Sequence, residues 1–288
     1  MPQLDRDAAR EWIRRWDLQQ EDHLPDREDR FTALIDAVQD GAGRADPLIV
    51  DLGCGPGSLS VRLLERIPAA AIVAVDADPV MLALAQAAYR GPSTPGSPSP
   101  PGPGPGSLSA SDSHGGASAP GSLRFVSVDL RTPGWSAKLG LDRPADAAVS
   151  TTALHWLSPD ALRAMYAELA QVLRRGGLLL NGDHLGVDES HSPVLAKLSE
   201  ALLKREEQRR FPDGHAESWT GWWDAIAAEP ALAGPVAERE AWRGHADHHG
   251  WASRLLTTHV DALHDAGFTE TGTLWQRGEN CLLCAVRG

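Results

Sequence analysis

Short apolar segments alternate with amphipathic segments along most of the chain. Five apolar segments have the length of buried strands, at 47–52, 71–75, 123–128, 145–150 and 178–183. Helical patterns separate them at 58–67, from Pro79 to about Tyr89, and at 159–175, where Gly176-Gly177 is expected to cap the helix. This alternation predicts βαβ units and a mainly parallel sheet.

The remaining chain carries a helical segment at 193–210, a region rich in Trp and His up to about residue 250, and a helix at 251–266. Gly267-Phe268 then begins two final strands, and Arg277-Gly278-Glu279-Asn280 between them is typical of a hairpin turn. We therefore predict an α/β fold with a doubly wound sheet of seven strands. The sheet is expected to be mostly parallel, with an antiparallel C-terminal strand.

Residues 1–288 are expected to form a single domain, with a helical N-terminal cap at 1–46 and a helical insertion at 184–250. Between 91 and 122, Gly, Pro and Ser fill 25 of 32 positions. Such a segment cannot bury enough apolar surface to offset the entropy of ordering it. We expect a disordered insertion within the domain; a linker between two domains is the alternative.

Charge and composition exclude several classes of partner. Lys and Arg total 27 against 39 Asp and Glu, and the formal net charge of −12 would repel nucleic acid. Three cysteines cannot build a disulfide framework, the first residues do not resemble a signal peptide, and no apolar run has the length of a membrane span. We expect a cytoplasmic protein that acts on a small molecule, with neither nucleic acid nor membrane as a partner. The oligomeric state stays open.

A glycine-rich loop follows the first predicted strand. The segment VDLGCGPGS, at 50–58, places three glycines at alternate positions before a helix, where the backbone can turn tightly and approach a ligand. The spacing fits neither the dinucleotide fingerprint G-x-G-x-x-G nor a Walker loop. The loop therefore suits a nucleoside whose tail is not a phosphate. Asp76, 19 positions after Gly57 at the end of the second strand, is placed to bind ribose hydroxyls.

Three segments in order carry a family resemblance: the glycine loop VDLGCGPGS, VAVDADP with Asp76, and FVSVDL with Asp129. Together they resemble the class I S-adenosylmethionine-dependent methyltransferases, whose sheet is Rossmann-like. The resemblance implies S-adenosylmethionine as the cofactor and an adenine contact by Asp129 and the backbone near Leu130. It also implies that Asp76 holds the ribose. The remaining cofactor contacts are expected from Asp51, Gly53, Gly55 and Gly57 at the methionine end, and from Thr151. The resemblance also implies that the helical insertion at 184–250 is a substrate cover.

The fourth-strand segment ADAAVSTTALHWL and the fifth-strand segment LRRGGLLLNGD resemble the branch of this family that methylates small molecules. They are similar to the trans-aconitate and malonyl-carrier-protein methyltransferases. In that branch an amide often precedes the Trp, whereas this chain has His155 before Trp156. Because of this difference, no substrate is carried over from the resemblance.

Histidine is the natural base near neutral pH, and several histidines lie where the transferable methyl is expected. His155 follows the fourth strand, and Asp183 and His184 follow the fifth, at the rim where ligands of α/β sheets bind. We predict His155, His245 and His248 as catalytic, and His249, Asp183 and His184 as substrate contacts. The alternatives are a packing role for His155, strand-end caps at Asp183 and His184, and a metal held by the three histidines at 245–249. We expect no metal.

Half of the ten tryptophans lie between Trp219 and Trp251 in the predicted cover. Clustered indoles can shape a flat apolar cavity, although a helical stripe of Trp is more often core. We predict substrate contacts at Trp156 and Trp222. Cys281 and Cys284 are three apart in a strand and therefore point to opposite faces, so we expect buried thiols and no joint metal site.

The sequence thus predicts a methyltransferase that uses S-adenosylmethionine and acts on a small apolar or aromatic acceptor, of a kind found in specialised metabolism. The acceptor atom stays open among O, N, C and S. The alternative is an S-adenosylmethionine-binding protein that is non-catalytic or catalyses a reaction other than methylation.

Overall fold

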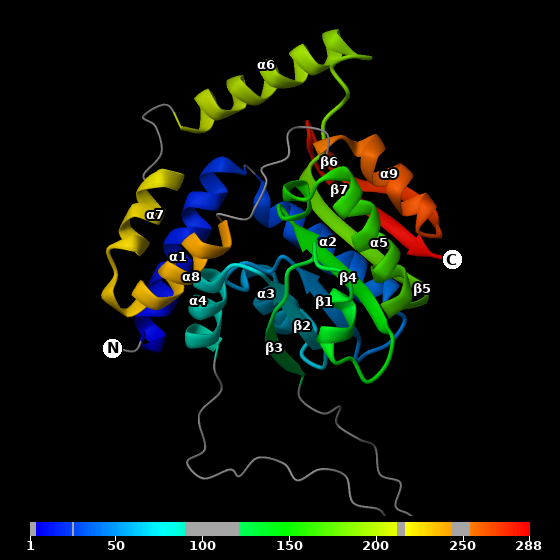
Figure 1. The fold of residues 1–288 in the computed structure, drawn as a ribbon. Helices are drawn as coiled ribbons and strands as arrows, with labels where there is room; N and C mark the ends of the chain where they lie inside the picture. The colour runs from blue at the N-terminus through cyan, green and yellow to red at the C-terminus, as the bar shows by residue number, and fades with distance from the viewer. Residues whose placement is uncertain (1–3, 25, 90–120, 212–216, 244–253) are drawn as a thin grey trace, which may run out of the picture.

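Parallel strand pairing builds the centre of the molecule (Figure 1). The computed structural model describes residues 4–24, 26–89, 121–211, 217–243 and 254–288. Seven strands form one sheet in the order β3-β2-β1-β4-β5-β7-β6. Their bounds are β1 Leu48–Leu52, β2 Ala71–Asp76, β3 Ser122–Ser127, β4 Ala145–Thr151, β5 Leu173–His184, β6 Phe268–Arg277 and β7 Asn280–Arg287.

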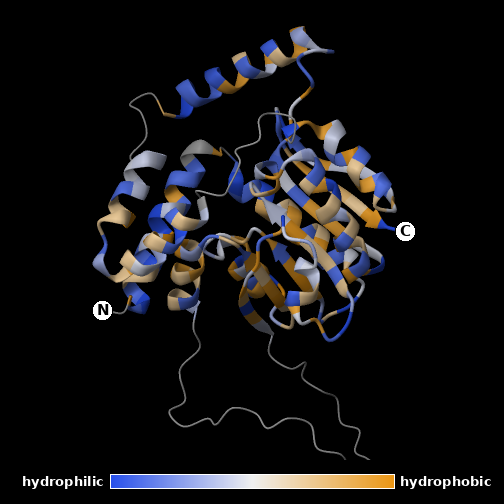
Figure 2. Cartoon of the chain, viewed as in Figure 1, coloured by the Kyte–Doolittle hydropathy of each residue, from blue (hydrophilic) through white to orange (hydrophobic). Residues whose placement is uncertain are grey.

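The strands β3, β2, β1, β4 and β5 pair in parallel, whereas β7 pairs antiparallel with both β5 and β6. The predicted seven-stranded sheet with an antiparallel C-terminal strand is therefore confirmed. All five residues of β1 are buried, and all but Asp51 are apolar, as is typical of a central parallel strand. Figure 2 shows the hydrophobic residues concentrated in the strands and in the helix faces that meet them.

Helices cover both faces of the sheet. On one face lie α2 (Arg27–Gly41) and α3 (Ser58–Arg66), whose Phe31, Leu34 and Leu63 pack against strand residues such as Ile49. On the other face lie α5 (Pro159–Val172) and α9 (Leu256–Asp265), together with the short 3-10 helix η1 (Trp135–Leu139). The sheet lies between these two apolar layers. Polar groups lie at the edge of the sheet that is formed by the carboxyl ends of its parallel strands.

The junction of α5 and β5 differs from the prediction. The helix ends at Val172, and Gly176-Gly177 lies inside β5 instead of capping the helix. Leu173 is already extended (φ −79°, ψ 140°) and begins the strand. Gly176, at φ +69°, accommodates an irregularity where the pairing of β4 with β5 shifts register.

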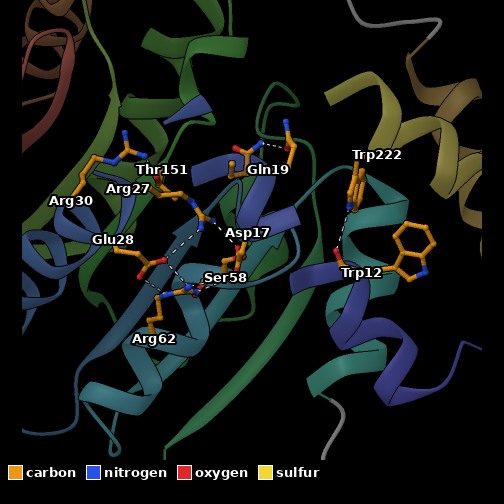
Figure 3. A network of polar contacts seen from close by, with 11 residues as sticks. Trp12, Asp17, Gln19, Arg27, Glu28, Arg30, Ser58, Arg62, Thr151 and Trp222 are labelled. Atoms are coloured by element: carbon orange, nitrogen blue, oxygen red, sulfur yellow. Dashed lines mark hydrogen bonds and ion pairs between the residues drawn. The ribbon is translucent and has the colours of Figure 1, made fainter. Parts of the chain in front are cut away.

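A second group of helices lies beside the sheet: α1 (Arg6–His23), α4 (Pro79–Tyr89), α7 (Trp219–Ala227) and α8 (Ala233–Arg243). Trp222 is fully buried among them, with its ring centroid 4.9 Å from that of Trp16. Its indole N–H donates to the carbonyl oxygen of Trp12 at 3.4 Å (Figure 3). The prediction that Trp222 contacts the substrate is therefore wrong, because α1 and α7 bury this indole between them.

Helix α6 (Pro193–Arg210) is the least embedded helix of the predicted cover, with no buried residue. Its C-terminal half contacts the body through Arg210, which pairs with Asp26 at 2.5 Å, and through Glu206, which pairs with Arg277 of β6 at 2.9 Å. The 3-10 helices η2 (Leu154–Trp156) and η3 (Pro230–Leu232) complete the described elements. Within these elements no helix is long and apolar enough to cross a membrane.

Cys281 and Cys284 lie in β7 on opposite faces of the sheet, and neither forms a disulfide. Burial raises the pKa of both thiols to about 11, which makes them poor thiolates at neutral pH. Residues 91–120 of the predicted insertion, His245, His248, His249 and Trp251 lie outside the described residues.

The burial of Trp222 predicts a large stability effect. Trp222→Ala should lower the free energy of unfolding by about 3–5 kcal/mol, because truncation leaves a cavity between α1 and α7. Trp219→Ala is the matched control in the same helix, and it should cost clearly less because Trp219 is 40% exposed. Chemical denaturation measures both values. Equal losses would contradict the assignment of Trp222 to the core.

Candidate active site

The glycine loop lies at the carboxyl end of β1, as the sequence predicts. Gly53, Gly55 and Gly57 have φ values of +71°, +55° and +88°, which residues other than glycine rarely adopt. The amides of Gly53 and Cys54 both donate to the carbonyl oxygen of Val75, at 2.8 and 2.9 Å, and so hold the loop against β2. A Cβ added at Gly55 would meet no atom within 4 Å, so a ligand can approach the backbone there.

Asp51 lies fully buried beneath this loop. Its Oδ2 accepts a hydrogen bond from the hydroxyl of Ser60 at 2.5 Å, whereas its Oδ1 has no partner within the described residues. Burial raises the pKa of Asp51 to about 7, against the lowering effect of the Ser60 hydrogen bond. An orphaned buried oxygen is costly, and a donor on a bound ligand or an ordered water would satisfy it.

Asp76, at the end of β2, connects the loop to the next helix. Its Oδ2 accepts from the amide of Gly55 at 2.7 Å, and its Oδ1 accepts from the amide of Asp78 at 2.8 Å. Removal of the carboxylate from water raises the pKa of Asp76 to about 6, against the lowering effect of these backbone donors. Asp78 in turn caps α4 through the amides of Val80 and Met81.

Asp129 follows β3 and is surrounded by donors. The backbone and side chain of Arg131 donate to it at 2.5–3.1 Å, and the indole N–H of Trp242 donates to its Oδ2 at 3.3 Å. Partial burial acts to raise the pKa of Asp129, but the donors on Arg131 and Trp242 outweigh it and lower the pKa. The adjacent Leu130 packs against the apolar cluster behind it.

Thr151, at the end of β4, accepts a hydrogen bond at 2.8 Å from Nη2 of Arg30 in α2 (Figure 3). Arg30 is fully buried, and its Nη1 donates to Oδ1 of Asn280 at 2.6 Å. Burial lowers the pKa of Arg30 to about 10, and the negative charge of Asp183 partly offsets this effect. Arg30 thus joins α2, β4 and β7 at the same edge.

His155 and Asp183 form a hydrogen-bonded pair. Nδ1 of His155, in η2, lies 2.8 Å from Oδ1 of Asp183, at the end of β5. The Asp183 side chain is fully buried, whereas that of His155 is 11% exposed. Burial acts to raise the pKa of Asp183, but the charge and hydrogen bond of His155, the charge of His259 and the amide of His184 together lower it. The pair therefore resembles the base-and-orienter arrangement of hydrolytic enzymes.

The burial of Asp183 and His184 bears on the prediction that both residues contact the substrate. The Asp183 side chain is bonded to His155 and closed off from solvent, which leaves no exposed part of it for a substrate to contact. Burial lowers the pKa of His184 to about 4, so its imidazole is neutral at neutral pH, and its Nε2 has no partner among the described residues. Trp156, by contrast, is 53% exposed, and its ring centroid lies 5.0 Å from that of His155.

The structure adds residues that the sequence analysis did not identify. Arg30 and Trp242 contact the predicted site residues Thr151 and Asp129 from helices more than 100 positions away, and Asn280 in turn accepts a hydrogen bond from Arg30. Figure 3 shows a further link, in which Asp17 of α1 accepts from Ser58 at the start of α3 (2.6 Å) and pairs with Arg27 at 3.0 Å. No group of three or more metal-ligating side chains occurs within the described ranges.

Residues 49–95, which include the glycine loop and Asp76, match the methyltransferase domain family. Over 135 residues the chain is 32% identical to trans-aconitate 2-methyltransferase of Streptomyces coelicolor and 33% identical to that of Streptomyces avermitilis. Residues 49–95 therefore match a methyltransferase domain, and the chain is similar to methyltransferases over the 135 aligned residues. The cofactor of this methyltransferase family is S-adenosylmethionine.

The aligned segment covers 47% of this chain and 34% and 38% of the two relatives, so the chain spans little more than a third of their length. Among solved structures, it is similar to human N-acetylserotonin methyltransferase in complex with S-adenosylmethionine, at 16% identity and a TM-score of 0.47. That match covers 90% of this chain and 51% of that one. Another similar structure is magnesium protoporphyrin IX methyltransferase of Synechocystis, at 17% identity and a TM-score of 0.44, which covers 91% and 79% of the two chains.

The raised pKa of Asp76 predicts a pH dependence of cofactor binding. The ionised carboxylate is the better acceptor for ribose hydroxyls, and its pKa is about 6. As the pH falls through 6, Asp76 takes up a proton, and the affinity for S-adenosylhomocysteine should fall by up to about tenfold per pH unit. Calorimetric titrations between pH 5 and 8 measure this inflection.

Asp76→Asn is the matched variant, because it keeps the size of the side chain and cannot ionise. Its affinity should be lower at pH 8, and the inflection near pH 6 should be absent. An inflection of the same size in both proteins would assign the titration to another group, and Asp51, with a pKa of about 7, is then the next to test.

Proposed function

We propose that this chain transfers a methyl group from S-adenosylmethionine to a small-molecule acceptor, with His155 as the general base. The observation that carries the proposal is the 2.8 Å contact between His155 and the buried Asp183, at the same sheet edge as the glycine loop. A base oriented by a buried carboxylate, beside a loop of this family, is the combination that proton removal coupled to methyl transfer requires.

The residues present fit the cofactor. Gly55 leaves open space at the loop, and the unpartnered Oδ1 of Asp51 can accept a hydrogen bond from the amino group of the methionine end, directly or through water. In the proposed arrangement Asp76 binds the ribose, and Asp129 with the backbone of Leu130 binds the adenine. The methionine end is proposed to lie against Gly53, Gly55, Gly57 and Thr151.

When bound, S-adenosylmethionine supplies an electrophilic methyl group on a sulfonium sulfur, which leaves as a neutral thioether. His155 would take the proton of the acceptor on Nε2. Asp183 accepts from Nδ1, which keeps Nε2 unprotonated and ready, and its negative charge stabilises the imidazolium that forms. An acceptor that is already ionised would not need this proton transfer.

The acceptor is proposed to be apolar or aromatic. Support comes from Trp156, whose exposed indole lies next to His155 and offers a flat apolar surface at the site. The relatives are named for trans-aconitate, a tricarboxylate, so they support a small acceptor and not its apolar character. Helices α6, α7 and α8 are proposed as the cover within residues 184–250, and residues 1–46 as the N-terminal cap. His245 and His248 are proposed to assist catalysis, and His249 to contact the acceptor.

His155→Gln and Asp183→Asn test the proposed base. Each should lower turnover by about 10²-fold or more, the usual loss for a general base, with little effect on the affinity for S-adenosylhomocysteine. Turnover is measured by mass spectrometry as S-adenosylhomocysteine formed with a panel of phenols, aromatic carboxylic acids and trans-aconitate. Thermal melting checks that both variants are folded.

The chain offers a matched control pair. His191 and Asp188 are also 2.8 Å apart, but the His191 side chain is 83% exposed. His191→Gln should therefore leave turnover unchanged. Wild-type rates in both site variants would show that neither residue supports the reaction, and a loss on addition of a chelator would point to a metal. Methylthioadenosine as the product would favour a reaction other than methylation.

A further inference from the structure

Helix α8 reaches the carboxylate that is proposed to bind adenine. Trp242, in its last turn, donates its indole N–H to Oδ2 of Asp129 at 3.3 Å, and the guanidinium of Arg131 lies over the indole ring, 5.4 Å from its centroid. These three residues come from two segments more than 100 positions apart. An aromatic ring is therefore placed directly beside the proposed adenine site by an element outside the glycine loop and the strand ends.

Helix α8 is fixed in this position by a second contact. Arg239 forms a 2.6 Å ion pair with Asp78, two residues after Asp76, and its guanidinium lies 3.4 Å from the ring centroid of Trp223 in α7. Both side chains of the ion pair are largely buried, at 10% and 12% exposed. Because one turn of helix separates Arg239 from Trp242, the anchor holds the indole near Asp129 rather than leaving it free in solvent.

The hydrogen bonds at Asp129 indicate how a purine can enter. Arg131 donates three times from its side chain and once from its backbone, at 2.5–3.1 Å, so the 3.3 Å bond from Trp242 is the longest of the set. An exocyclic amino group that approaches Asp129 can replace this weakest donor most easily. The indole then stays next to the purine and presents a ring face to it.

We propose that Trp242 is a binding residue for the adenine of the cofactor, with the purine stacked on its indole. Arg131 lies over one face of the indole, so the purine is proposed to stack on the opposite face. The inference rests on the proposed function, because it takes Asp129 as the adenine contact. It adds a contact from the cover itself, so that cofactor binding and the position of α8 depend on each other.

The experiment compares Trp242→Ala and Trp242→Phe with the wild-type chain, by calorimetric titration with S-adenosylhomocysteine and with 5′-methylthioadenosine. Loss of the ring in Trp242→Ala should weaken both ligands by about tenfold, the effect of one lost base–aromatic stack, because both carry adenine. Trp242→Phe keeps a stacking face and loses only the N–H donor, so its affinities should stay within about threefold of wild type. Trp275→Ala, in the outer strand β6 at the other end of the strand order from β3, should change neither affinity.

Unchanged binding in both Trp242 variants would overturn the inference. Tighter binding in both would also overturn it, because it would show that the indole competes with adenine for Asp129. If the wild-type chain binds neither ligand, the proposed function fails and the inference fails with it. Thermal melting of Trp242→Ala separates a lost stack from a lost fold, and Trp242→Phe gives a second measure if the Ala variant is unstable.

Discussion

The parallel pairing of five strands is the constraint on which the rest of this structure depends. It brings the carboxyl ends of β1, β2, β3, β4 and β5 to one edge, so that loops from distant parts of the sequence meet there. The loop at Gly55, the carboxylates of Asp76 and Asp129, and the pair of His155 with Asp183 all follow from this arrangement. The antiparallel β7 extends the same sheet and contributes Asn280, which holds Arg30 at that edge.

Several ionisable groups lie at this edge in buried surroundings that disfavour their charged forms. Asp51 and Asp76 have pKa values raised to about 7 and 6 by burial, above those of an unfolded chain. Their contribution to stability is therefore present at low pH and is lost as the pH rises through these values. Near neutral pH the ionised carboxylates of Asp51 and Asp76 lower the stability of the fold. A ligand that donates hydrogen bonds to them restores part of that stability. Such an arrangement favours a binding site over a purely structural role.

The sequence predicts the sheet, the glycine loop and the strand-end acids well, because each depends on residues close together in the chain. Gly176-Gly177 was misleading, since a glycine pair after a helix can equally allow a strand irregularity. The pairing of His155 with Asp183 could have been predicted from the sequence, because the two residues follow the ends of neighbouring strands, where Thr151 pairs with Gly182. Trp222, Arg30 and Trp242 could not be placed, because their roles depend on tertiary contacts between segments with no local signal.

The most direct test of the central claim, that this edge binds S-adenosylmethionine, is a calorimetric titration of the full chain with S-adenosylhomocysteine and, separately, with NADH. A loop without the dinucleotide spacing, opposite Asp76 and Asp129, predicts saturable binding of S-adenosylhomocysteine and none of NADH. Tight binding of NADH together with no binding of S-adenosylhomocysteine would contradict the assignment of the site.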